Sequence, residues 1–73
     1  MRIIAKNEFR TNINSDMYTI VLLNVGSIWK IVARSIFNNE TEVLFRDTSK
    51  ETVENKLIEL HNAFVTDRKI FFM

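Results

Sequence analysis

The side chains that could support catalysis are few and are scattered along the chain. His61 is the only imidazole, and a Ser–His–acid arrangement can be assembled on paper only from Ser49, His61 and Asp67. No Gly-rich turn of the kind that presents a nucleophilic serine accompanies them. We therefore interpret His61 as an ordinary surface or boundary histidine, and we expect no enzymatic activity and no catalytic residues.

Metal and cofactor sites also lack their usual ligands. The chain has one His and no Cys, whereas a structural zinc site needs four nitrogen or sulfur ligands. Asp16, Asp47 and Asp67 lie far apart and do not form a calcium-loop pattern. A single glycine rules out a Gly-rich phosphate loop. The sequence thus predicts neither a metal nor a cofactor.

The first 46 residues have the patterns of β-strands. Strands are predicted over residues 2–9, 17–24, 28–37 and 41–46, with polar or turn-forming segments between them. The segment 17–24 is apolar on both sides, which is typical of a central strand covered on both faces. Gly26 is expected to supply the positive φ of a type II turn, and Asn38-Asn39 to form a tight hairpin. Short turns between consecutive strands predict an antiparallel meander.

The remainder of the chain has the pattern of one helix and a short tail. Thr48 with Glu51 three residues later predicts a capping box at the start of the helix. An apolar stripe follows at helical spacing: Val53, Leu57, Leu60 and Phe64. We expect a helix over residues 48–66 and a tail or edge strand over 69–73.

Together these elements predict the α+β class. The expected fold is an antiparallel sheet of about four strands, with one C-terminal helix packed on one face and a possible extra edge strand from the tail. The whole chain, 1–73, is expected to be a single domain in which residues 1–46 supply the sheet.

Composition places the chain among small globular proteins. It has 73 residues, 47% of them hydrophobic and 26% charged, and a net charge of +1. No run approaches the roughly 18 apolar residues of a membrane helix, and the N-terminus lacks the apolar run of a secretory signal. The initial Met and the lack of a tag suggest a complete chain. Without cysteine, the sequence predicts an intracellular, cytoplasmic protein with no disulfide to support its core.

Apolar residues remain that the predicted core does not use. They lie on the sheet face away from the helix, which we call the helix-free face, and in the C-terminal tail. The candidate interface consists of Ile28, Val32, Ile36, Leu44, Ile70, Phe71, Phe72 and Met73. A contiguous exposed apolar patch usually marks an interaction site. The tail either pairs within its own sheet or adds as a strand to another chain.

These residues predict a homodimer and a non-enzymatic protein-binding module whose partner is unidentified. Small size and an Asn- and Ile-rich composition suggest a phage or mobile-element accessory protein that binds and inhibits a host protein.

A nucleic-acid-binding function is the alternative, because basic residues share the same expected face. The candidate residues are Arg2, Lys6, Arg10, Lys30, Arg34 and Arg46. A basic sheet face is one way in which small folds hold single-stranded nucleic acid. The order of strands followed by one helix loosely resembles the coactivator-type single-strand DNA-binding modules, a likeness of topology alone.

Overall fold

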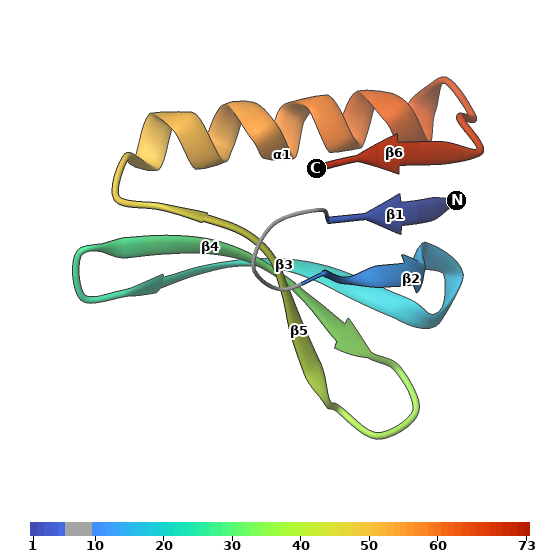
Figure 1. Ribbon diagram of the computed structural model, residues 1–73, viewed down its shortest axis with the longest axis horizontal. Helices are drawn as coiled ribbons and strands as arrows, with labels where there is room; N and C mark the ends of the chain where they lie inside the picture. Colours follow the sequence, from blue (N-terminus) through green and yellow to red (C-terminus); the bar gives the residue numbers. More distant parts are fainter. Residues whose placement is uncertain (6–9) are drawn as a thin grey trace.

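The middle of the chain forms a three-stranded antiparallel meander, seen in the computed structural model, which describes residues 1–5 and 10–73. Its strands are β3 (Tyr18–Val25), β4 (Ile28–Ser35) and β5 (Thr41–Asp47), in the order β3-β4-β5. The predicted α+β class and antiparallel sheet are confirmed. The meander has three strands because the N-terminal segment belongs to a different sheet (Figure 1).

The two ends of the chain build this second, smaller sheet. It contains β1 (Arg2–Ile4), β2 (Asn12–Asn14) and β6 (Ile70–Phe72), in the order β2-β1-β6. β2 is antiparallel to β1, whereas β6 is parallel to it, with Ile3 opposite Phe71. The predicted tail strand therefore exists and pairs within its own chain. Of the strand predicted over 2–9, β1 accounts for the first part, and residues 6–9 lie outside the described residues.

A short 3-10 helix, η1 (Ser15–Met17), leads from the small sheet into β3, and the long helix α1 (Lys50–Val65) follows β5. The predicted helix is confirmed, but its cap is Ser49 rather than Thr48. Ser49 Oγ accepts a hydrogen bond from the Thr52 backbone N–H at 3.2 Å, and Asp47 Oδ1 accepts one from the Ser49 N–H at 2.8 Å. Among the described residues, no helix is both long and apolar enough to cross a membrane.

Both predicted hairpins form, with different turns. Val25 pairs with Ile28, so the β3–β4 loop has two residues, and Gly26 with φ +62° occupies its first central position. The first central position of a two-residue hairpin loop requires positive φ in a type II′ turn. The turn is therefore of type II′ and not of the predicted type II. β4 ends at Ser35 rather than at residue 37, and Asn39 supplies positive φ within the longer loop that follows.

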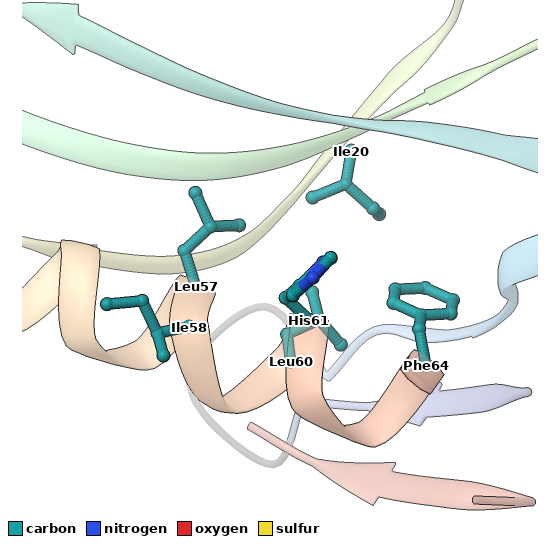
Figure 2. A pocket seen from close by; sticks show the side chains of 6 residues that line it. All are labelled: Ile20, Leu57, Ile58, Leu60, His61 and Phe64. Carbon is teal, nitrogen blue, oxygen red and sulfur yellow. The ribbon is translucent and has the colours of Figure 1, made fainter. Parts of the chain in front are cut away.

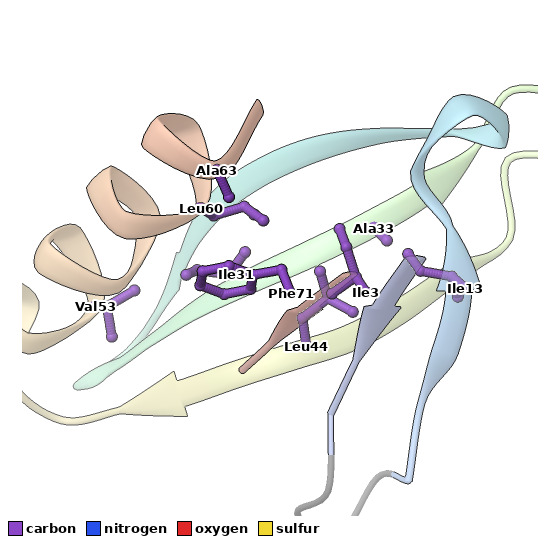
Figure 3. Close-up of a cluster of buried hydrophobic side chains, with 9 residues drawn as sticks. All are labelled: Ile3, Ile13, Ile31, Ala33, Leu44, Val53, Leu60, Ala63 and Phe71. Atoms are coloured by element: carbon purple, nitrogen blue, oxygen red, sulfur yellow. The ribbon is translucent and has the colours of Figure 1, made fainter. Parts of the chain in front are cut away.

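The core lies where α1 and the small sheet together cover one face of the meander. Its buried members are Ile3, Ile13, Ile31, Ala33, Leu44, Val53, Leu60, Ala63 and Phe71 (Figure 3). Tyr18 and Trp29 are half-buried and pack against this cluster. A core drawn from both sheets and the helix explains how so short a chain encloses apolar residues without a disulfide.

The placement of Leu44 corrects the predicted helix-free face. Ile31 pairs with Phe45, and Val32 pairs with Val43, so a β-bulge leaves Leu44 as the extra residue of β5. The bulge interrupts the alternation of side chains, and Leu44 enters the core with 0% exposure. Leu44 therefore does not lie on the helix-free face with Ile28 and Val32.

Candidate interaction surface

The helix-free face of the meander is the surface opposite α1. Because Ile31 and Ala33 of β4 point into the core, the alternate residues of that strand point the other way. Cross-strand pairing then places their neighbours on the same face. The rows across the sheet are Thr19–Arg34–Thr41, Val21–Val32–Val43, Leu23–Lys30–Arg46 and Val25–Ile28.

This face combines an apolar centre with positive charge. Of the strand residues whose side chains point to this face, six are Val, Leu or Ile, three are Lys or Arg, and none is acidic. Lys30 lies directly opposite Arg46, and the row of Val21, Val32 and Val43 separates these two cations from Arg34. Arg34 and Arg46 are exposed, and Lys30 is half-buried. The most accessible apolar side chains, Leu23 and Val25, lie toward the Lys30–Arg46 end of the face. The arrangement suits a partner with apolar residues beside carboxylates.

The predicted interface residues are divided among several places. Ile28 and Val32 lie on the helix-free face, where Val32 is only 4% exposed. Ile36 lies in the β4–β5 loop and is exposed, as are Phe37 and Met17. The backbone N–H of Ile36 donates a hydrogen bond to the Met17 carbonyl.

The tail residues belong to the small sheet. Phe71 is buried in the core, and Met73 is half-buried against it. Ile70 and Phe72 are exposed. The structure does not bring the tail together with Ile28 and Val32 as one patch.

The predicted nucleic-acid-binding residues are also separated. Lys30, Arg34 and Arg46 share the helix-free face. Arg2 belongs to β1, where its Nη1 donates to Asn12 Oδ1 at 3.2 Å, and exposed Arg10 lies beside Glu42 at a shallow hollow. Lys6 lies outside the described residues.

The aromatic residues of the meander lie on its opposite face. Tyr18, Trp29 and Phe45 all pack against the core. Helix cations cover two of the rings, with Lys50 Nζ 5.0 Å from the Trp29 ring centre and Lys56 Nζ 5.5 Å from that of Phe45. No strand position that alternates to the helix-free face is aromatic, so the described strand residues of this face offer no ring on which a base could stack.

A second surface, which the sequence did not predict, lies between α1 and β3. It is an apolar hollow of about 430 Å³, lined by Ile20, Leu57, Ile58, Leu60, His61 and Phe64 (Figure 2). Leu57, His61 and Phe64 project from the helix toward Ile20 of β3. The predicted helix stripe contains Leu57, Leu60 and Phe64, but only the position of β3 at the sheet edge leaves Leu57 and Phe64 partly exposed while Leu60 is buried. His61 is exposed at this hollow.

Among the described residues, no group of three or more His, Asp or Glu side chains could hold a metal ion.

Comparison of the chain with protein-family models, with curated proteins and with solved structures gives no match.

Proposed function

We propose that this protein is a non-enzymatic protein-binding module that holds its target on the helix-free face. The observation that supports this most directly is the composition of that face, an apolar centre with Lys30, Arg34 and Arg46 around it. Apolar contact supplies most of the affinity of a protein interface, and complementary charge supplies orientation and rate of association. The target is therefore a protein surface with apolar residues flanked by carboxylates.

The distribution of aromatic residues favours a protein target over nucleic acid. Proteins that bind single strands combine a basic groove with aromatic rings on which the bases stack. The rings of the meander belong to the core, and two of the six predicted nucleic-acid-binding residues, Arg2 and Arg10, lie outside the meander. Single-stranded nucleic-acid binding through Lys30, Arg34 and Arg46 is the alternative function.

The proposal includes a homodimer that acts inside the cell. In the form that the sequence suggests, a phage or mobile-element accessory protein, the target is a host protein that is inhibited when bound.

Site-specific photo-crosslinking tests the proposed target face. A photoreactive residue at Thr41, which is exposed on the helix-free face, should cross-link one target protein in the source cells. The same residue at Asn55, exposed on α1, should not. Arg34→Glu should then weaken binding of the purified target by about tenfold or more, because it replaces a cation beside the apolar centre with a negative charge that repels the carboxylates of the target. Equal cross-linking from both positions would contradict the proposal.

Binding to short single-stranded oligonucleotides at two salt concentrations tests the alternative. Affinity that falls steeply with salt and is lost in Arg34→Glu would establish nucleic-acid binding instead. We expect no measurable binding at low salt.

A further inference from the structure

The sequence of β3 does not match its position in the sheet. Tyr18–Val25 contains eight residues and no charge, and its apolar residues occur on both faces. Such sequences are typical of central strands. In the described structure, however, β3 pairs only with β4 and forms the edge of the meander.

The other three sheet edges have the features that keep edge strands from pairing with another chain. β2 and β6 have only three residues each. β5 carries Glu42, Arg46 and Asp47 and contains the bulge at Leu44. Short length, charge and bulges are the usual protections of an exposed edge. β3 has none of them.

The core is also incompletely covered beside β3. The inward residues of β4, Ile31 and Ala33, are fully buried, whereas Ile20 and Leu22 of β3 are only half-buried. Across the hollow, Ile58 is 56% exposed and Phe64 is 42% exposed. Along the free edge of β3, the backbone therefore lacks a second neighbouring strand, and nearby apolar side chains remain partly exposed.

We propose that the chain forms a homodimer in which two β3 strands pair antiparallel and the two hollows between α1 and β3 close on each other. A twofold axis through Val21 or Leu22 brings nearly the whole strand into register and puts no charge opposite a charge. It converts both meanders into one six-stranded sheet in which β3 has the central position that its sequence suits. The two hollows then meet on the same face, and Ile58 and Phe64 of each copy approach the axis.

The β3 edge is long enough to run along most of one dimension of the molecule. Eight strand residues span about 27 Å, which is close to the 28 Å middle dimension of the molecule. A stable interface buries about 800 Å² on each partner. This is about one sixth of the 4945 Å² that the chain exposes. A second copy is the occupant that supplies both an equally long uncharged edge and a matching hollow.

This dimer specifies the self-association included in the proposed function, but it uses a different surface from target binding. It joins the two helix-free faces side by side, so one dimer presents two copies of the basic and apolar surface.

Two pairs of matched variants test the interface. Ile58→Lys changes the hollow, and Asn55→Lys makes a similar change at an exposed helix position that does not line it; each new lysine follows a glutamate by four residues, which favours the helix. Thr19→Glu changes β3, and Thr41→Glu changes β5; both threonines are exposed and lie directly opposite Arg34. Thermal melts followed by circular dichroism establish that all four variants fold.

Sedimentation equilibrium from low to tens of micromolar gives the readout. The unsubstituted chain should be a dimer, and Ile58→Lys and Thr19→Glu should each raise its dissociation constant by about tenfold or more. The two control variants should change it less than about twofold. Hydrogen exchange should show amide protection in β3 that increases with protein concentration.

Three results would overturn the proposed dimer: a monomer at tens of micromolar, a dimer that withstands both test variants, or a dimer that Thr41→Glu disrupts as strongly as Thr19→Glu. Target cross-linking from Thr41 is measured separately. A monomer that still captures its target would refute self-association and leave the proposed target binding intact, and a dimer without a target would refute only the proposed target-binding function.

Discussion

Leu44 is the residue whose role depends most on one local irregularity of the backbone. The bulge in β5 moves it from the helix-free face into the core, where it is 0% exposed. We predict that Leu44→Ala lowers the free energy of unfolding by about 2–5 kcal/mol, because it removes buried methyl groups and leaves a cavity. Urea denaturation followed by circular dichroism measures the change.

Leu23→Ala is the matched control for this substitution. Leu23 lies on the helix-free face of β3 and is 36% exposed, so the same truncation should cost about 1 kcal/mol or less. A loss of about 1 kcal/mol or less in Leu44→Ala would show that Leu44 is not in the core and that the face assignment of β5 is wrong.

At the level of elements, the N-terminus of α1 is capped by the side chain of Ser49. Ser49 Oγ satisfies the Thr52 N–H, whereas Thr48 lies before the cap and makes no such bond to the helix. Ser49→Ala should lower the free energy of unfolding by about 1 kcal/mol, since it leaves this amide without its partner. Thr48→Ala should have little effect in the same urea titration. A larger loss in Thr48→Ala would support the capping box that the sequence suggested.

The sequence predicts elements better than it predicts their neighbours. Alternation and capping signals locate four of the strands and the helix because these signals are local. They cannot fix which strand lies at an edge: the apolar run of β3 indicates a central strand, but the chain places it at the side of the meander. The bulge at Leu44 is also invisible, because one extra residue changes the face of a side chain without changing its type.

For the candidate surface too, the sequence predicts what lies within one strand but not what depends on neighbouring elements. Alternation correctly places Lys30 and Arg34 on one face because they belong to one strand. Arg2 and Arg10 were grouped with them only because a four-stranded meander was expected, and the separate small sheet removes them. The hollow beside β3 depends on how α1 crosses the meander, which no local pattern specifies.

At the scale of the whole molecule, the fold is completed by contact between its two ends. β6 pairs in parallel with β1, and the Arg2 N–H donates to the Lys69 carbonyl at 2.9 Å while the Met73 N–H donates to the Ile4 carbonyl at 2.9 Å. A parallel pair cannot be joined by a short hairpin, and here almost the whole chain is the connection between the two strands. Pairing of β6 with β1 is therefore favoured when the meander and α1 have already brought the two ends of the chain together.

This dependence makes the C-terminal strand a support of the whole fold. Phe71 is 5% exposed and joins the core between the small sheet and the meander, whereas its neighbour Phe72 is 53% exposed. We predict that Phe71→Ala lowers the free energy of unfolding by about 3–5 kcal/mol, a large share of the total stability of so small a domain. Phe72→Ala should change it by about 1 kcal/mol or less. The expected loss for Phe71→Ala is cooperative, so circular dichroism and Trp29 fluorescence should give the same urea midpoint. Loss of the small sheet alone, with the meander and α1 still folded at that midpoint, would show that the chain ends are an independent unit.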